Sequence, residues 1–485
     1  MAITGGDLLN SVPNARQQAT VSNYLDLASE AGKGWAQQYV PDLMEKEAEV
    51  FGPRTISGFL EQVGAEEAMT ADQVVWSEQG RLHLSYKGNM SAENVFTAER
   101  DIDGNADSIT DHGVRVNDTV LISNANGIFK AIVSGVSAAA ITVAPYDAVA
   151  IAALTTADAT TLLVYGSEFA KGVGYNPADS ALTTSRLSNE PQFNSFTNKP
   201  IIMKDYYEIS GSDASRIGWV EISAEEGGSG YLWYVKAEAD TRARFNDYVE
   251  MAMLESVKGS GTNAVDTLLG VDGNDTAVGT EGLFAAIESR GNVTSGISGV
   301  NAATDLAEFD SILAEFDKQG AIEENMLFLN RASSLAIDDM LASMNSYGAG
   351  GTSYGVFDND EDMALNLGFS GFRRGSYDFY KSDFRYLNDQ ATRGGINAAN
   401  AAGAIRGVII PAGTSSVYDQ TVGASMKRPF LHVRYRASQT DDRRMKTWVT
   451  GSVGAATSAL DAMQLHMLTE RCLITQGANN FMLMK

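Results

Sequence analysis

The sequence YLWYVKAEADTRARFNDYVEMAMLESVK, residues 231–258, has the strongest influence on the fold. It contains no Gly or Pro and lies between the glycine-rich GGSG at 227–230 and Gly259. Side chains suited to a buried face recur every three or four residues along it: Tyr234, Ala237, Thr241, Phe245, Tyr248, Val249 and Ala252. At about 1.5 Å per residue the predicted helix spans on the order of 40 Å, more than twice the length of a typical globular helix. The pattern therefore predicts a domain extended along one axis and packed against one side of this helix.

Apolar residues alternate with polar ones on both sides of this helix, which predicts strands. The alternation covers residues 199–211 before the helix, and 431–436 and 445–450 near the end of the chain. A final strand is predicted at 481–484. Between these strands, the spacing of apolar residues predicts a helix through Met463, Met467 and Leu468. The single cysteine, Cys472, falls in the same apolar helical pattern and is predicted to be a buried thiol.

Two further regions have patterns of their own. Short apolar runs separated by Asn-Asp and Asn-Gly turns at 111–165 predict a small β barrel or sandwich inserted into a larger domain. Residues 263–424 alternate between helical and strand patterns. They include an amphipathic helix at 306–316, preceded by Thr304 as its predicted N-cap, and a buried strand at 408–410.

The composition favours a well-folded protein of two or more folding units, because 485 residues exceed one ordinary core. No apolar run is long enough to span a membrane, and the first residues lack a signal-peptide pattern, so a cytosolic origin is expected. The net charge of −25 argues against nucleic-acid binding as the main activity, because such proteins normally present a basic surface. Acidic walls suit a container that holds DNA without adhering to it, although acidity also simply aids solubility.

The charges are unevenly placed along the chain. Residues 1–72 hold four basic and eleven acidic residues, whereas residues 427–446 hold seven basic and two acidic ones. Such opposite poles predict contacts between neighbouring subunits, with two independently solvated faces as the alternative. The candidate inter-subunit residues are Glu45, Glu47, Glu49, Arg434, Arg436, Arg443 and Arg444.

The chain contains few motifs of catalytic or ligand-binding sites. The chain has no phosphate-binding P-loop and no dinucleotide-binding GxGxxG in a strand–helix context. GTSYG at 351–355 matches the GxSxG pattern around a nucleophilic Ser353, but its glycine-rich flanks predict a loop and not a strand–turn–helix. Aromatic and basic residues interleave at 369–386, which we interpret as strands at a subunit interface and not as a single-stranded nucleic-acid site. We therefore predict no catalytic residue, cofactor or metal.

Four short strings are similar to strings found in one protein family: VWSE at 75–78 followed by Arg81, YEISGS at 207–212, GTEGLF at 279–284 and TERCL at 469–473. The predicted order of elements is an extended arm, a two-stranded β excursion, a long helix, a central α/β region and long C-terminal strands. This order resembles the Hong Kong 97-type (HK97-like) fold of major capsid proteins in tailed double-stranded DNA bacteriophages. The resemblance covers nearly the whole chain, and the extended form is similar to capsid proteins of podoviruses, including the crAss-like group.

The resemblance implies an α+β protein with a long spine helix, an extended N-terminal arm, a β-hairpin E-loop and an inserted small β domain. Its expected parts are the arm at 1–75, the E-loop region at 76–198 with the β module at 111–165, the peripheral domain at 199–262 with the spine helix, the axial α/β domain at 263–424, and the rest of the peripheral domain, with C-terminal strands and a helix, at 425–485.

The implied function is structural and not enzymatic. Copies are expected to assemble into the hexamers and pentamers of an icosahedral head, which encloses double-stranded DNA without binding it specifically. The expected partners are scaffolding, portal, and decoration or head-fibre proteins, and the expected location is the virion after assembly in the host cytoplasm, with no membrane. Two alternatives stay open: a virion or surface adhesin or decoration protein that uses the β module, and a serine hydrolase that uses Ser353.

Overall fold

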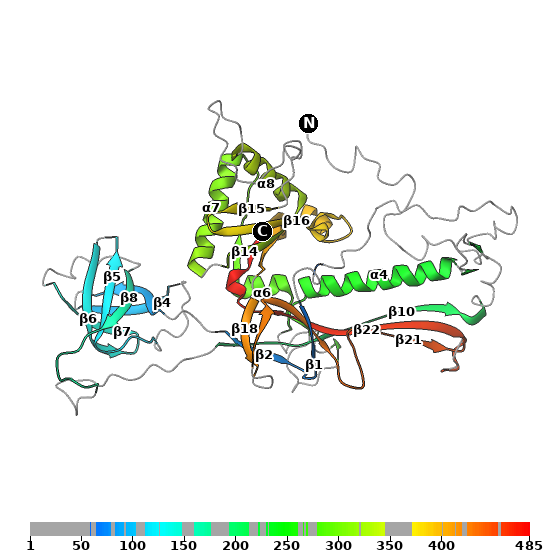
Figure 1. Ribbon diagram of the computed structural model, residues 1–485, viewed down its shortest axis with the longest axis horizontal. Coiled ribbons are helices and arrows are strands. Elements are labelled where there is room, and N and C mark those ends of the chain that lie inside the picture. The colour runs from blue at the N-terminus through cyan, green and yellow to red at the C-terminus, as the bar shows by residue number, and fades with distance from the viewer. Residues whose placement is uncertain are drawn as a thin grey trace. The chain divides into compact units, whose positions relative to one another are not determined.

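A computed structural model describes the chain in two compact units, one formed by residues 1–75 with 197–485 and the other by residues 76–196 (Figure 1). The described residues are 59, 65–78, 83–91, 94–102, 112–125, 127–147, 160–175, 194–212, 222–223, 229–230, 232–259, 265, 268–269, 279–319, 322–344, 371–399, 401–412, 414–419, 424–453 and 457–485. Most of the predicted arm at 1–75, including Glu45, Glu47 and Glu49, lies outside them, as does Ser353.

The first unit contains a long sheet with the strand order β1-β20-β22-β10, in which β21 also pairs with β22. The strands are β1 (Ala65–Met69), β10 (Ile201–Ser210), β20 (Leu431–Arg436), β21 (Lys446–Gly451) and β22 (Ala462–Thr475). β1 is parallel to β20, and the other pairs are antiparallel. The strands predicted at 199–211, 431–436 and 445–450 are therefore confirmed.

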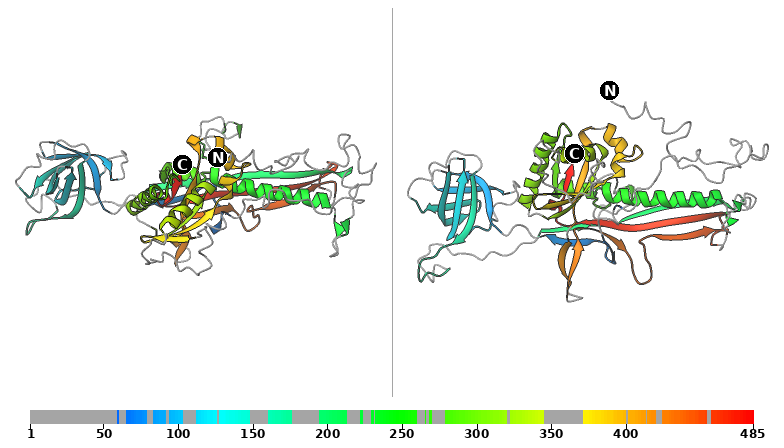
Figure 2. Two further views of the ribbon diagram at one scale, coloured as in Figure 1. Left: turned by 90° about the horizontal axis from the view of Figure 1, so that it is seen from above. Right: turned by 45° about the horizontal axis from the view of Figure 1, so that its top comes forward.

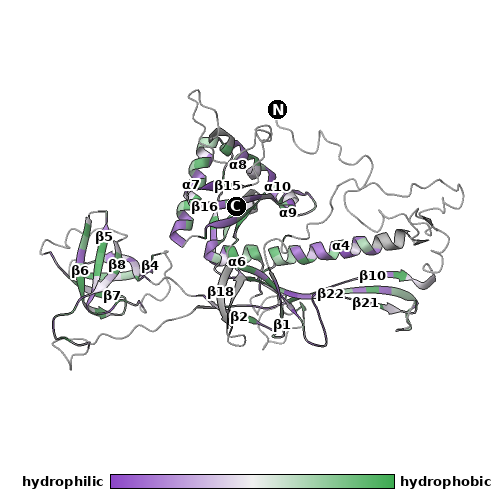
Figure 3. Cartoon of the chain, in the orientation of Figure 1, coloured by the Kyte–Doolittle hydropathy of each residue, from purple (hydrophilic) through white to green (hydrophobic). Residues whose placement is uncertain are grey.

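Helix α4 (Leu232–Glu255) follows the long axis of this sheet, beside β10 and β22 (Figures 1 and 2). The long helix predicted at 231–258 is confirmed. Phe245 and Val249 are buried against Met467 of β22. Tyr248 was predicted on the buried face but is 45% exposed, so that assignment is wrong. Figure 3 shows apolar and polar residues interleaved along α4, as expected for a helix with one buried side.

The helix predicted through Met463, Met467 and Leu468 is wrong, because these residues belong to strand β22. Residues four apart, such as Met463 and Met467, lie on one face of a strand as well as of a helix, so their spacing does not separate the two structures. Residues 467–475 are buried on both faces apart from Arg471, which removes the alternation that would have marked a strand. Cys472 is buried as predicted, but in this strand.

A second, six-stranded sheet in the same unit has the order β13-β23-β17-β14-β16-β15. Its strands are β13 (Asn292–Thr294), β14 (Glu324–Leu329), β15 (Gly371–Arg374), β16 (Tyr377–Asp383), β17 (Gly407–Pro411) and β23 (Met482–Met484). The accompanying helices are α6 (Leu283–Arg290), α7 (Ala302–Gln319), α8 (Arg331–Met344), α9 (Arg385–Asn388) and α10 (Arg393–Ala399), with 3-10 turns η6 (Ala401–Gly403) and η7 (Ala478–Asn480). The strands predicted at 408–410 and 481–484 are confirmed.

Two sequence interpretations of this region need correction. The N-cap of α7 is Asn301 and not Thr304, since Asn301 Oδ1 accepts a hydrogen bond from the Thr304 amide at 3.0 Å. The aromatic residues of 369–386 were interpreted as an interface, but most of those described belong to the core. Phe372 and Phe379, for example, stack at 5.3 Å and pack with Phe309 of α7. A sheet beneath α7 needs apolar side chains on its covered face, which accounts for them.

Several short strand pairs complete the description. They are β2 (Val74–Glu78) with β9 (Asn194–Asn198), β11 (Ile222–Ser223) with β12 (Ser229–Gly230), and β18 (Thr414–Asp419) with β19 (Ala424–Pro429).

The second unit is a closed six-stranded barrel with the order β3-β4-β7-β6-β5-β8. Its strands are β3 (Ser85–Met90), β4 (Val95–Asp101), β5 (Asp118–Asn124), β6 (Gly127–Ser137), β7 (Ala140–Pro145) and β8 (Thr160–Ser167). Phe96, Ile122, Ile141 and Leu162 are fully buried in its interior. The small β module predicted at 111–165 as a barrel or a sandwich is a barrel, and it also includes β3 and β4, because closing the barrel without edges requires both strands.

Candidate subunit interface

The long sheet of the first unit has one face covered by α4 and another that is partly open. Paired residues of neighbouring strands point to the same face, so the register assigns each side chain to one of the two. Met203 and Met467 face α4, where they pack with Phe245 and Val249. Residues of the opposite parity in β10, β22 and β21 therefore point away from the helix.

An aromatic row crosses the face turned away from α4. Tyr206 of β10 pairs with His466 of β22, which pairs with Trp448 of β21. His466 stacks on Trp448 at 5.2 Å and on Tyr206 at 6.0 Å between ring centroids. Thr450 Oγ1 lies 2.7 Å from His466 Nε2 and fixes the position of the central ring. The three side chains form one preorganised surface, which we call the aromatic row.

The outer members of this row remain in contact with solvent. Tyr206 is 56% exposed, Trp448 is 37% exposed, and Ile202, four residues before Tyr206 on the same face of β10, is 54% exposed. Large aromatic side chains held rigidly on a surface are typical anchors of protein–protein contacts. Sequence alternation alone does not predict the row, because the row depends on the register of β21 and β22 with β10, which lies far from them in the sequence.

Arg434 and Arg436, predicted as inter-subunit contacts, lie on β20 and pair with acids of the same chain. Arg434 contacts Glu67 Oε2 at 3.1 Å, in register across the β1–β20 pair. Arg436 contacts Glu470 Oε1 at 3.1 Å and also pairs with Asp72. The hydrogen bond and charge of Arg436 hold the pKa of the exposed Asp72 carboxyl below its usual value.

The other two predicted arginines lie in the segment before β21. Arg443 contacts Glu470 Oε2 at 2.8 Å, and Arg444 pairs with Glu66, which Arg471 also contacts at 3.1 Å. The four arginines are thus brought together near β1, and the end of the acidic N-terminal segment supplies several of their partners. Their predicted contact with Glu45, Glu47 and Glu49 of another subunit stays a prediction, since those three residues lie outside the described part of the chain.

The described residues hold neither a metal-binding cluster nor a membrane-spanning helix. These residues contain no group of three or more His, Cys, Asp or Glu side chains placed to hold a metal ion. No helix among them is both long enough and apolar enough to cross a bilayer.

No protein-family model matches the sequence, and no curated protein matches it either. Among solved structures, a chain of Microbacterium phage Oxtober96 is similar over 95% of this chain and 99% of its own, with 9% identity and a TM-score of 0.38. The capsid of a native GTA particle is similar over 94% and 97%, with 10% identity and a TM-score of 0.36. The mature capsid of bacteriophage PhiM1 is similar over 91% of both chains, with 8% identity and a TM-score of 0.38.

Proposed function

We propose that this chain is a shell-building subunit, the major capsid protein of a tailed double-stranded DNA phage. The observation that carries the proposal is the aromatic row, formed by Tyr206, His466 and Trp448. A sheet is normally either covered on both faces, which are then apolar, or covered on one face only, and the uncovered face is then polar. Here α4 covers one face, and the other presents ordered aromatic rings to solvent. A neighbouring subunit that packs on the row would complete the layer.

Within this proposal, the long sheet and α4 act as the peripheral domain with its spine helix. The six-stranded sheet with α7 and α8 acts as the axial domain, and the barrel acts as an insertion in the E-loop region. The proposed assembly is the HK97-like one, in which subunits form hexamers and pentamers of an icosahedral head. Scaffolding, portal, and decoration or head-fibre proteins are its proposed partners, and the virion is its proposed location.

The net charge of −25 fits the proposed role. A shell must enclose DNA without holding it at fixed sites, and acidic surfaces repel phosphates at short range. Glu67 pairs with Arg434, and Glu66 pairs with Arg444. The same complementarity of charge would join an acidic arm to a neighbouring subunit. In that assembly Glu45, Glu47 and Glu49 would extend the contact that Glu66 and Glu67 make within the chain.

Adjacent substitutions on opposite faces of β21 test the proposal. Trp448 belongs to the aromatic row, whereas Val449 points to the other face and is 48% exposed. Trp448→Lys is expected to abolish assembly, because an aromatic anchor at an interface commonly contributes about 2 kcal/mol or more and each shell repeats the loss at every contact. Val449→Lys should assemble as the unmodified chain does. Sedimentation velocity and negative-stain microscopy of chains co-expressed with their flanking genes measure the result.

Two outcomes would contradict the proposal. One is an unmodified chain that stays monomeric in every co-expression and never enters particles. The other is an equal loss of assembly in both variants, which would indicate general damage to β21. Thermal melting of each purified variant checks that the fold is retained.

A further inference from the structure

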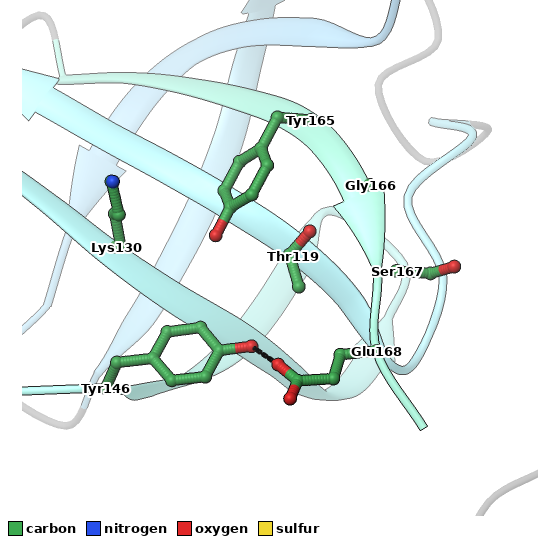
Figure 4. Close-up of a pocket in the computed structure, with 7 residues that line it drawn as sticks. All are labelled: Thr119, Lys130, Tyr146, Tyr165, Gly166, Ser167 and Glu168. Carbon is green, nitrogen blue, oxygen red and sulfur yellow. Dashed lines mark hydrogen bonds between the residues drawn. The ribbon is translucent and has the colours of Figure 1, made fainter. Parts of the chain in front are cut away.

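The barrel has a shallow pocket of about 490 Å³ on its surface, next to β5, β6 and β8 (Figure 4). This volume lies within the range of about 300 to 1,000 Å³ that is usual for small-molecule sites. Its lining combines two tyrosines with one basic, one acidic and two hydroxyl side chains and a glycine: Thr119, Lys130, Tyr146, Tyr165, Gly166, Ser167 and Glu168. The shell-building role proposed above uses none of these residues.

A β-bulge places Tyr165 at the pocket. Thr119 of β5 pairs with Gly166, and the next residue, Val120, pairs with Val164, so Tyr165 is the extra residue of β8. Its ring is 53% exposed. A Cβ at Gly166 would lie 3.2 Å from Thr119 Oγ1, so the glycine leaves the floor of the pocket open. Bulges commonly redirect a side chain towards a functional surface, and this one presents an aromatic ring beside a hydroxyl group.

The opposite wall is held in position before any ligand binds. Tyr146, which is 51% exposed, donates a hydrogen bond from its hydroxyl to Glu168 Oε2 (Figure 4). The backbone amide of Tyr146 donates to Lys130 O at 3.2 Å, and that of Glu168 donates to Asn117 O at 3.0 Å. Asn117 Nδ2 also donates to Glu168 O at 2.8 Å. Such bracing reduces the ordering cost of binding.

We infer that this pocket binds a short, uncharged oligosaccharide. The faces of two tyrosine rings attract the positively polarised C–H groups of a sugar ring. Lys130 donates hydrogen bonds, the Glu168 carboxylate accepts them, and the Thr119 and Ser167 hydroxyls do both, which matches a ligand rich in hydroxyl groups.

The charges of the pocket argue against other ligand classes. One lysine and one glutamate leave it without net charge, and a nucleic acid would require a basic groove along its backbone. The inference extends beyond the proposed shell-building role, because it requires only the barrel.

The test uses the full-length chain and an array of bacterial surface oligosaccharides, followed by calorimetric titration with the strongest binder. Tyr165→Ala should weaken binding at least about tenfold, because it removes one stacking face. Tyr165→Phe, which keeps the ring, should stay within about threefold of the unmodified chain. Tyr175→Ala is the matched control, because Tyr175 is 66% exposed in the same unit but does not line the pocket. This variant should bind the oligosaccharide with the affinity of the unmodified chain.

The inference is overturned if no oligosaccharide on the array binds, or if Tyr165→Ala and Tyr175→Ala bind equally well. It is also overturned if the chain binds no sugar while Tyr165→Ala changes the sedimentation of its assemblies, since the pocket would then be a protein contact. Both variants replace exposed residues, and a thermal melt checks their folding. A chain that binds sugar but never assembles would refute the shell-building role alone.

Discussion

Asn198 is a buried amide that joins three segments of the first unit. Its Oδ1 accepts hydrogen bonds from the Glu281 amide at 2.8 Å and from Thr280 Oγ1 at 3.2 Å. Its Nδ2 donates to Leu473 O at 2.6 Å and to Glu281 O at 3.2 Å. The side chain is completely buried, so water cannot replace these partners. Asn198 therefore ties the end of β9 to β22 and to the segment before α6.

Replacing this amide should destabilise the first unit strongly. Asn198→Ala leaves the Glu281 N–H and the Leu473 carbonyl without their buried partner, at an expected loss of about 2 to 3 kcal/mol in the free energy of unfolding. Gln464→Ala is the control, because Gln464 donates to Glu208 Oε2 at 2.7 Å on the exposed surface of the same unit, and about 0.5 kcal/mol is expected there. Urea denaturation measures both. Equal losses would refute the role given to Asn198.

Cys472 provides a reporter of the same sheet because it is the only cysteine of the chain. Burial raises the pKa of its thiol to about 12, with the charge of Arg434 opposing the shift. The thiolate is the reactive form, so native protein at pH 8 should react with Ellman's reagent at least about a hundredfold more slowly than protein in urea. Rapid labelling of the native chain would show that β20 and β22 separate readily.

The raised thiol pKa also predicts a pH dependence of stability. The unfolded thiol ionises near its ordinary pKa of 9.0, whereas the folded thiol stays protonated up to about 12. The unfolded state therefore loses its proton first, and the thiol's contribution to stability is complete below pH 9 and is lost as the pH rises towards 12. Cys472→Ala should show a shallower decline over this window than the unmodified chain, as measured by urea midpoints.

At the scale of elements, α4 contributes through one narrow buried stripe. Phe245 is 1% exposed, whereas Tyr248, three residues later, is 45% exposed. Phe245→Ala should cost about 3 to 5 kcal/mol of unfolding free energy, because it leaves a cavity against β22. Tyr248→Ala should cost about 0.5 kcal/mol or less. The urea denaturation midpoints of the two variants measure these losses of stability. A larger loss for Tyr248→Ala than for Phe245→Ala would refute the assignment of the buried stripe.

Elements with an unambiguous period could be predicted from the sequence. The run around Phe245 lacks breakers and repeats every three or four residues, so it predicted α4 closely. The strand β22 could not be predicted, because Met463 and Met467 fit both periods and most of the residues after them are buried on both faces. The start of α7 was placed too late for a similar reason, since Asn301 and Thr304 are both acceptable caps and only the backbone geometry selects Asn301.

At the scale of the whole molecule, the barrel has a core of its own. Phe96, Val120, Ile122 and Ile141 are completely buried inside it. A fragment of residues 76–196 should therefore fold alone and unfold cooperatively, because a closed barrel leaves no strand edge unpaired. Circular dichroism of the fragment during heating measures whether it unfolds in one cooperative transition. A fragment with no cooperative transition would show that the barrel depends on the rest of the chain.

The sequence by itself determined the long helix, the strands at 199–211, 431–436 and 445–450, a small β-rich module after residue 111 and the opposite charge poles. These features follow from local periods, turn residues and the order of charges along the chain. Only the tertiary structure decided which charges meet, since Arg434 finds Glu67 through a parallel strand pair that joins residues far apart in sequence. It also decided the aromatic row and the barrel pocket. Strand register makes neighbours of Tyr206, His466 and Trp448, and a bulge places Tyr165 at the pocket. Neither arrangement is visible in a local sequence pattern, because each depends on how separate strands pair.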